Sequence, residues 1–381
     1  MSADIPMIPF IDLKAQQARI RPQIDEAIRK VLDSGQYIMG PEVAELETEL
    51  AKYSGAKYAL ACSSGTSALV LAMMVLGLKP NDAVFVPSFT FIATAEAVLL
   101  AGGVPVVVDV EEGSFNMDPE DLKKAIIDAK NDGLNPKIVV PVDLFGCPAD
   151  YAAITEIAKE NNMYVVDDGC QSFGASLEGK MVGSLADITA TSFFPAKPLG
   201  CYGDGGALFT DNPEYLELMK SFRVHGMGTD RYENVRIGIN GRLDTMQAAI
   251  LLIKMSILAE EMQLREKIAV RYREGIKNVS HQVIPETVHS AWAQFSFLLP
   301  GDGKIRGKVQ ADLKAKGIPT MIYYPIPIHR QEAYAKYASK RAFPVSDMLA
   351  ERIVSVPMHP YLEEKTQSYI IEAVNEAIEK A

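Results

Sequence analysis

The sequence predicts an α/β fold in which helices cover a largely parallel sheet. Apolar runs of strand length alternate along the chain with segments whose apolar residues recur at helical spacing, the order typical of this class. Several runs are apolar at nearly every position, as expected for strands that are covered on both faces. The 381 residues, of which 48% are hydrophobic and 23% charged, are enough to bury a large core and to form a major and a minor domain.

Six segments have the length and apolar character of strands. In chain order they are residues 83–87, 104–110, 137–144, 164–167, 188–194 and 206–210. Amphipathic helices are predicted around them. Apolar residues recur at helical spacing over 43–50, before a stop at Gly55, and over 122–129, after the start signal Asp118-Pro119.

A long helix is predicted to begin near Leu243 and to join two domains. It runs past residues 247–253, most of which are apolar. We place the domain boundary within this helix, so that residues 1–254 form a large α/β domain and residues 255–381 a smaller C-terminal α+β domain.

The charge of the chain argues against nucleic acid or an anionic membrane as a partner. The formal net charge is −11, and no long basic run occurs. The N-terminus lacks the basic and apolar regions of a signal peptide, and no apolar run approaches the roughly 18 residues of a membrane span. We therefore expect a cytoplasmic protein.

The four cysteines, Cys62, Cys147, Cys170 and Cys201, are far apart in the sequence. They form no C-x-x-C pair and have no histidine at ligand spacing, so neither a zinc site nor a disulfide framework is predicted. We expect free thiols and no metal site.

A candidate phosphate-binding segment lies in Ala61-Cys-Ser-Ser-Gly-Thr-Ser-Ala68, directly before an apolar helix at 69–76. A helix N-terminus offers unpaired backbone N–H groups, and small residues allow a phosphate to approach them. We assign Gly65 and Thr66 to this role. Serine and threonine are also the ordinary N-cap residues, so a plain helix cap is the alternative interpretation.

A candidate carboxylate lies where the run Val165-Val-Asp-Asp-Gly leaves its strand. The pyridine nitrogen of pyridoxal phosphate (PLP) has to stay protonated for the ring to draw electrons from a substrate, and an ionised carboxylate beside it keeps it so. Asp168 is the candidate, and Gln171 is placed to hydrogen-bond the ring hydroxyl. A turn is the alternative, because Asp-Asp-Gly is also a turn signal.

Lys197 lies in a short glycine-rich loop after the strand-like run 188–194, with Ser192 five residues before it. A lysine amine acts as a nucleophile only when its pKa is lowered, which partial burial under a bound cofactor achieves. Lys197 is therefore the candidate for an imine with an aldehyde cofactor. A solvated surface lysine is the alternative.

These segments resemble the ordered motifs of the PLP-dependent nucleotide-sugar aminotransferases, the DegT/DnrJ/EryC1/StrS family. The likeness covers nearly the whole chain. The motifs are Cys62-Ser-Ser-Gly-Thr-Ser-Ala-Leu69, Pro87-Ser-Phe-Thr-Phe-Ile-Ala-Thr-Ala-Glu96, Asp168 with Gln171, Ser192-Phe-Phe-Pro-Ala-Lys197 and Gly238-Ile-Asn-Gly-Arg-Leu-Asp-Thr-Met-Gln-Ala-Ala249.

The resemblance implies a PLP-dependent transferase of fold type I, with a mostly parallel seven-stranded sheet and a homodimer whose active sites lie at the subunit interface. Its motif positions imply a role for each site residue. Lys197 holds the cofactor as an imine and then moves the substrate proton, while Asp168 pairs with the pyridinium. The remaining cofactor contacts are Phe91 stacked on the ring, Gln171 at its hydroxyl, and Gly65, Thr66 and Ser192 at the phosphate, joined by Asn240 of the other subunit.

The run 191–206 and the segment Tyr324-Pro-Ile-Pro327 resemble a subgroup that aminates UDP-2-acetamido-2-deoxy-3-oxo-glucuronate for O-antigen sugars. Arg242 is then expected to meet the sugar carboxylate, because a guanidinium binds carboxylates in a bidentate manner. Tyr323 and Tyr324 stand where the subgroup has His-Tyr, and we add His329 as a possible sugar or phosphate contact.

We therefore expect a two-step transamination in which glutamate leaves its amino group on the cofactor as pyridoxamine phosphate, which then aminates C3 of the keto sugar. The alternatives are amination at C3 or C4 of another UDP-, dTDP- or GDP-keto sugar and a non-catalytic PLP-binding regulatory protein. A dehydratase of the same fold is disfavoured because it typically has histidine in place of Lys197. A nicotinamide dehydrogenase is disfavoured because no G-x-G-x-x-G follows the first strand.

Overall fold

The structure is a computed structural model that describes residues 8–230, 232–337 and 341–381. Its centre is a seven-stranded sheet in the order β1-β9-β8-β5-β4-β2-β3. The pairs β8–β5, β5–β4, β4–β2 and β2–β3 are parallel, and β9 runs antiparallel to both of its neighbours. The expected mostly parallel sheet of seven strands is confirmed. Its strands are β1 (Tyr58–Cys62), β2 (Asp82–Pro87), β3 (Val104–Val108), β4 (Asn135–Val139), β5 (Tyr164–Asp168), β8 (Ile188–Ser192) and β9 (Gly206–Thr210).

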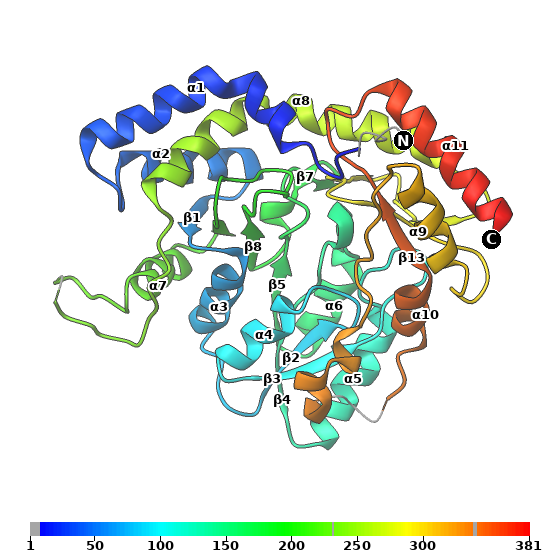
Figure 1. Ribbon diagram of the computed structural model, residues 1–381. Helices are drawn as coiled ribbons and strands as arrows, with labels where there is room; N and C mark the ends of the chain where they lie inside the picture. Colours follow the sequence, from blue (N-terminus) through cyan, green and yellow to red (C-terminus); the bar gives the residue numbers. More distant parts are fainter. Residues whose placement is uncertain (1–7, 231, 338–340) are drawn as a thin grey trace.

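Helices cover both faces of this sheet, because successive side chains of a strand point to opposite sides. In β2, Val84 and Val86 pack with α3 and α4, whereas Phe85 packs on the other face with α5 and α6. Figure 1 shows the resulting layers. The helices that accompany this sheet are α1 (Leu13–Ser34), α2 (Pro41–Ser54), α3 (Gly65–Val75), α4 (Ala93–Leu100), α5 (Pro119–Asn131), α6 (Tyr151–Glu160) and α7 (Pro213–Arg223), followed by α8 (Thr245–Gly275), which continues toward the C-terminal part.

The C-terminal part forms a smaller layer of helices on a three-stranded sheet, β10-β12-β13. Its core includes Tyr272, Phe295, Phe297 and Val374. The elements are β10 (Ser280–His281), β12 (Phe295–Leu298), β13 (Ile353–Val356), α9 (Arg306–Ala315), α10 (Pro344–Arg352), α11 (Glu364–Lys380) and the short helices η3 (Ile328–Arg330) and η4 (Glu332–Tyr337). A third small sheet and two more short helices join the domains: β6 (Ser176–Leu177), β7 (Lys180–Met181), β11 (Val288–His289), η1 (Leu144–Gly146) and η2 (Val182–Ser184).

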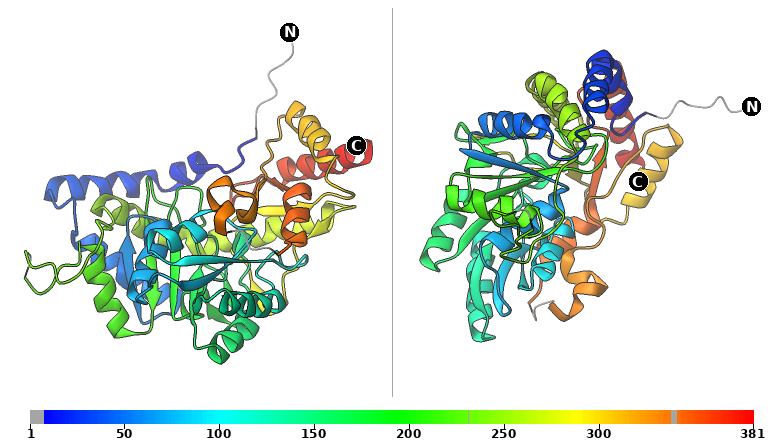
Figure 2. Two further views of the ribbon diagram at one scale, coloured as in Figure 1. Left: turned by 90° about the horizontal axis from the view of Figure 1, so that it is seen from below. Right: turned by 90° about the vertical axis from the view of Figure 1, so that its left-hand side faces the viewer.

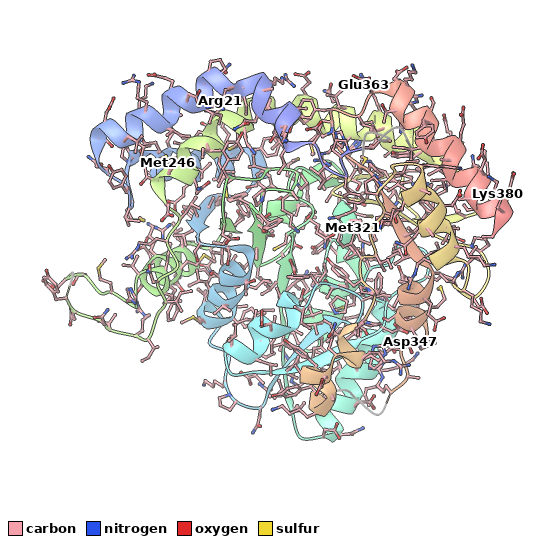
Figure 3. The ribbon with its side chains drawn as sticks, in the orientation of Figure 1. Arg21, Met246, Met321, Asp347, Glu363 and Lys380 are labelled. Atoms are coloured by element: carbon pink, nitrogen blue, oxygen red, sulfur yellow. The ribbon has the colours of Figure 1, made fainter. Side chains whose placement is uncertain are left out.

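Helix α8 runs beside α1 along one edge of the molecule and continues as far as the C-terminal core (Figures 1 and 2). In Figure 3, Met246 marks the first turn of α8, below Arg21 of α1. The boundary that we predicted between residues 254 and 255 falls inside this continuous helix. The division into two domains at that point stays a prediction.

The start and stop signals of the predicted helices have the expected physical form. Gly55 ends α2 in the left-handed conformation, with φ of 74°. The side chain of Asp118 accepts a hydrogen bond from the N–H of Glu120, and Pro119 takes the first position of α5. Both helices therefore begin or end where the sequence predicted.

Candidate active site

The residues that the sequence singled out meet at one edge of the large sheet. Strand β5 ends at Asp168 and β8 ends at Ser192, and these strands are parallel. Ser192 pairs with Gly206 of β9, which in turn pairs with Cys62 at the end of β1. The carboxyl ends of β1, β8 and β5 therefore lie side by side, which is where α/β proteins place their ligand sites.

The first part of the site is the N-terminus of α3. Ser64 caps the helix by accepting a hydrogen bond from the N–H of Ser67 at 3.0 Å. The N–H groups of Gly65 and Thr66 lie ahead of the first intrahelical bond and so are available to an anion. A Cβ atom at Gly65 would lie only 2.8 Å from both Cys170 Sγ and Ser192 Cβ. This cup is therefore shaped by the absence of a side chain at Gly65.

The second part is the carboxylate of Asp168, which is 5% exposed. The hydroxyl of Thr94 donates to Asp168 Oδ2 at 2.6 Å, and the backbone N–H of Cys170 donates to Oδ1 at 3.3 Å. The hydroxyl oxygen of Thr94 also lies 3.2 Å from the carbonyl oxygen of Phe91. Our sequence analysis did not assign Thr94, although it stands in the motif that contains Phe91.

Gln171 and Tyr324 form the wall next to Asp168. Gln171 Oε1 accepts a hydrogen bond from the N–H of Phe145 at 2.8 Å, and its Nε2 donates to the hydroxyl of Tyr324 at 3.3 Å. Burial, reinforced by the charge of Asp168, raises the pKa of Tyr324, so its hydroxyl is neutral. Phe91 is 54% exposed, and its ring lies 6.0 Å from that of Tyr324 between centroids.

Tyr323 continues this aromatic wall away from the sheet. Its ring centroid lies 5.8 Å from that of Tyr324 and 6.4 Å from that of Phe10. Burial raises the pKa of Tyr323 as well. The segment thus places two uncharged aromatic rings, packed edge to face, next to Gln171 and Phe91.

The third part is Lys197, whose loop folds back on itself. The N–H of Lys197 donates to the carbonyl of Phe194 at 2.8 Å, and the N–H of Cys201 donates to that of Phe193 at 2.8 Å. Lys197 is half-buried by surface area, and the surrounding protein still lowers the pKa of its ammonium through desolvation. Cys170 and Asp168 oppose this decrease, so both groups are close enough to the amine to act on its charge.

Asn240 and Arg242 lie on a segment beside the cup. The N–H of Ser63 donates to the carbonyl of Gly241 at 2.9 Å, and a cavity of about 420 Å³ is lined by Ser63, Asn240 and Arg242. Arg242 Nε is buried and makes no hydrogen bond to any residue of the described ranges. Asn240 is exposed. This part of the site thus combines a cavity with a guanidinium that helps to line it and whose buried Nε has no partner among the described residues.

His329 is hydrogen-bonded to other side chains of the protein. Its Nδ1 lies 2.6 Å from Ser88 Oγ, and its Nε2 lies 3.0 Å from Asp347 Oδ1, so both ring nitrogens have protein partners. Figure 3 labels Asp347, which comes from α10. His329 fastens its segment to the end of β2, and its role as a sugar or phosphate contact stays a prediction.

The arrangement fits the three chemical ends of PLP. The helix N-terminus with its bare glycine suits the phosphate dianion, the buried carboxylate suits a protonated ring nitrogen, and the half-buried amine suits the aldehyde. Among the described residues, no cluster of three or more His, Cys, Asp or Glu side chains is placed to hold a metal ion. None of the helices in the described ranges is both long and apolar enough for a membrane crossing.

Comparison with known proteins gives one consistent family. Residues 18–375 match the model of the DegT/DnrJ/EryC1/StrS aminotransferase family. The UDP-2-acetamido-2-deoxy-3-oxo-D-glucuronate aminotransferase of Pseudomonas aeruginosa is 46% identical over 359 residues, which cover 94% of this chain and 96% of that protein.

Two solved structures are similar over almost the entire chain. The crystal structure of a DegT DnrJ EryC1 StrS aminotransferase from Brucella abortus has a TM-score of 0.94 and 48% identity, and the match covers 97% of this chain and 99% of that one. The crystal structure of NtdA from Bacillus subtilis with bound cofactor PMP has a TM-score of 0.90 and 28% identity, covering 99% of this chain and 86% of that one.

Proposed function

The chain belongs to the DegT/DnrJ/EryC1/StrS aminotransferase family, and from this premise we propose which sugar it aminates and which residues do the work. It is a PLP-dependent sugar aminotransferase of fold type I whose cofactor alternates between PLP and pyridoxamine phosphate. Our proposed substrate is UDP-2-acetamido-2-deoxy-3-oxo-glucuronate, aminated at C3 with glutamate as donor, in the synthesis of a bacterial surface polysaccharide such as O-antigen.

PLP, when bound, supplies an electron-withdrawing ring and carries the amino group between donor and sugar. In our proposal the chain holds PLP at its phosphate and at its ring nitrogen. Gly65 and Thr66 offer backbone N–H groups to the phosphate, Ser192 adds a hydroxyl, and Asp168 keeps the ring nitrogen protonated. Thr94 holds Asp168 by its hydrogen bond of 2.6 Å.

The single observation that carries the proposal is the position of Lys197 relative to Asp168. Desolvation lowers the pKa of the Lys197 amine, and the charge of Asp168 opposes this decrease, so the amine and the carboxylate are close enough to interact. An amine with a lowered pKa is both a better nucleophile and a better proton acceptor at neutral pH. We propose that Lys197 holds the aldehyde carbon and then moves the proton at the substrate carbon.

Arg242 supports a sugar that carries a carboxylate. Its side chain has a buried donor without a protein partner, in a cavity that also contains Ser63 of the phosphate cup. A guanidinium in such a place gains two parallel hydrogen bonds from a carboxylate. Tyr323 and Tyr324 are proposed to flank the sugar ring.

We also propose a homodimer that acts in the cytoplasm. The segment after α7 projects from the body of the molecule in Figure 1, and it exposes 52% of Val235 and 87% of Ile237. Exposed apolar side chains beside Asn240 support contact with a second copy, whose site Asn240 would complete. The four free cysteines suit a reducing compartment.

The role of Lys197 is tested by Lys197→Ala. We expect the variant to lose turnover and the visible absorbance that PLP acquires on binding to an amine, with unchanged far-UV circular dichroism, because it lacks the amine that is proposed to bind the aldehyde. Lys180→Ala, at an exposed lysine of β7, serves as the control and keeps both properties. A Lys197→Ala protein with normal turnover contradicts the assignment.

The substrate proposal is tested by a pair of sugars that differ only at C6. We expect faster amination of UDP-2-acetamido-2-deoxy-3-oxo-glucuronate than of the analogue with a hydroxymethyl group. Mass spectrometry of the products measures both rates. Arg242→Leu should reduce kcat/KM for the carboxylate sugar about tenfold to a hundredfold, the size of one lost charged hydrogen-bonding pair, and leave the analogue unaffected. An equal loss of kcat/KM for both sugars would contradict a role of Arg242 in carboxylate binding.

A further inference from the structure

Helix α8 carries a row of polar side chains on one buried face. Gln247, Lys254 and Glu261 are separated by two helical turns each and so point in the same direction, and Arg265 follows one turn after Glu261. Lys254, Glu261 and Arg265 are 2%, 1% and 4% exposed. Burying charges is costly unless they are paired or hydrogen-bonded, so such a row calls for an explanation.

Lys254 faces the loop that carries Lys197. Its Nζ donates to the carbonyl of Gly200 at 2.6 Å and lies 4.3 Å from the centre of the Tyr202 ring. Burial lowers the pKa of Lys254 to about 8, with the charge of Glu261 opposing the decrease. The amine thus caps a carbonyl three residues after Lys197.

The loop at this point has no spare space. A Cβ atom at Gly200 would lie 2.5 Å from the carbonyl oxygen of Pro195 and 2.6 Å from that of Phe194. Gln247, two turns before Lys254, accepts a hydrogen bond from the N–H of Tyr202 at 2.8 Å. Gln247 and Lys254 of α8 therefore hold the C-terminal end of the loop. Backbone hydrogen bonds within the loop hold its N-terminal end.

The other end of the row is anchored outside the loop. Glu261 accepts hydrogen bonds of 3.0 Å from Gln16 of α1 and a further one from Tyr361. Arg265 donates to the carbonyl of Trp292 at 3.0 Å. The helix face that touches the Lys197 loop is thus fixed at its far end to α1 and to the C-terminal core.

We propose that Lys254 is a positioning residue that sets the height and direction of the Lys197 amine by holding the carbonyl of Gly200. This inference rests on the proposed role of Lys197. The hydrogen bond reaches the loop from a rigid helix, so its loss should let the loop relax without opening the cofactor cup at α3. Within the part of the chain that the structure describes, Lys254 makes no hydrogen bond to the cup or to Asp168.

The test is Lys254→Met, which keeps the length of the side chain and removes its donor. Purified variant and wild type are loaded with PLP and titrated with acid and base while the visible absorbance is recorded. We expect the midpoint of the variant to shift by about half a pH unit or more, and kcat to fall about tenfold with KM for the sugar within about twofold, because a misplaced catalytic group affects chemistry more than binding. Lys267→Met, at an exposed lysine of the same helix, is the matched control and should show neither change.

The outcomes separate this inference from the proposed function. If wild type shows no absorbance change with PLP, the assignment of Lys197 fails. If wild type titrates normally and Lys254→Met titrates identically with unchanged kcat, only the positioning role fails. Should Lys254→Met not fold, as judged by circular dichroism, Lys254→Arg decides: it retains a donor, so a midpoint and kcat close to wild type support the role, and the loss of both in a folded protein overturns it.

Discussion

At the scale of single residues, the environment of Asp168 explains how a carboxylate can be nearly buried and still serve a cation. It is 5% exposed and accepts hydrogen bonds from Thr94 and from the backbone of Cys170. Donors of this kind stabilise the ionised form and fix its direction. Thr94 therefore supports the proposed pairing with the ring nitrogen, although it touches no cofactor atom itself.

We expect Thr94→Val to weaken PLP binding about tenfold to a hundredfold, because a hydrogen bond to a charged group contributes about 1.5–3 kcal/mol. Equilibrium dialysis or fluorescence titration with PLP measures the effect. Thr155→Val, on the half-exposed surface of α6, makes the same change away from the site and should bind PLP normally. An unchanged affinity of Thr94→Val would show that Asp168 needs no support from this hydroxyl.

Asp167, the neighbour of Asp168, points to the other face of the sheet and is completely buried. Neither of its oxygens makes a hydrogen bond to a described residue. Burial raises the pKa of Asp167 well above 3.8, reinforced by the charge of Asp143, and the weaker influence of Tyr151 does not reverse this. Burial likewise raises the pKa of Asp143 to about 7. Asp167 and Asp143 are thus two buried acids whose pKa values are both raised.

The raised pKa of Asp167 predicts that the stability of the fold depends on pH. A group whose pKa is raised in the folded state stabilises the fold at low pH and loses that contribution as the pH rises through the folded value. We therefore expect Asp167→Asn to gain stability relative to wild type between pH 4 and pH 7, by at most about 1.4 kcal/mol per pH unit. Urea denaturation at a series of pH values measures it. Asp132→Asn, at an exposed acid, should follow wild type at every pH, and a parallel course for Asp167→Asn would mean that Asp167 is ionised in the folded protein.

The sequence alone pointed to Lys197 and Asp168, because Asp168 stands at the end of a predicted strand and Lys197 in the loop that follows another. It was insufficient for Thr94 and Lys254. Thr94 contacts Asp168 across 74 positions of sequence, and Lys254 contacts Gly200 across 54. Such partners depend on how the elements pack, which no local pattern specifies. For the same reason the partners of His329 were not predicted, since Ser88 and Asp347 reach it from distant elements.

At the scale of elements, the predicted strands differ from the observed ones mainly at their carboxyl ends. The run 137–144 was expected to be one strand, but β4 ends at Val139. Val142 still forms an isolated parallel bridge with Asp168, but no regular strand continues beyond Val139. Val142 and Leu144 are buried in a cluster with residues of the C-terminal part such as Leu298, so their apolar character also reflects this packing and hydrophobicity alone extended the strand too far.

Strand β1 was missed for the opposite reason. Its sequence, Tyr58-Ala-Leu-Ala-Cys62, contains no β-branched residue, and alanine is uncommon in strands. It pairs antiparallel with β9 along its whole length, from Tyr58 with Thr210 to Cys62 with Gly206. Long-range pairing therefore forms a strand that the local composition does not favour.

The start of α3 is the proposed phosphate site, and Gly65→Ala tests it. The added methyl group would lie 2.8 Å from Cys170 Sγ and Ser192 Cβ. We expect a loss of stability of about 1–3 kcal/mol by thermal unfolding, and PLP binding at least tenfold weaker by dialysis. Gly307→Ala, also near a helix start but with nothing within 4 Å of its added atom, should be neutral or slightly stabilising. Tight PLP binding by Gly65→Ala would mean that the phosphate binds elsewhere.

At the scale of the whole molecule, the exposed segment after α7 is the feature that a single chain leaves unexplained. Ile237 is 87% exposed, and its neighbour in sequence Asn240 lies beside the cavity with Arg242. An apolar side chain of this size is expected to be covered in solution. The homodimer that the resemblance implies would cover it.

We expect Ile237→Glu to shift the protein from two chains to one in sedimentation velocity, and to reduce turnover in parallel, because a charge in an apolar contact opposes association. Ile127→Glu changes a 60% exposed isoleucine on α5 and should leave the assembly intact. A wild-type protein that sediments as a single chain, or an Ile237→Glu protein that stays paired, contradicts the proposed contact.

Helix α8 also governs the order in which a nascent chain can be completed. Its first half packs on α1 and α2, which leave the ribosome long before it, so the N-terminal body stays open until this helix emerges. Its second half then displays Ile268 and Tyr272, whose partners Ile370 and Val374 are among the last residues to be translated. Domains generally fold as they emerge from the ribosome. Here α8 packs on N-terminal helices and on the last helix of the chain, so its packing is complete only when synthesis ends. A chain that ends between residues 275 and 370 therefore exposes the apolar face of α8 that Ile370 and Val374 would cover. Chaperones bind exposed apolar surfaces of this kind.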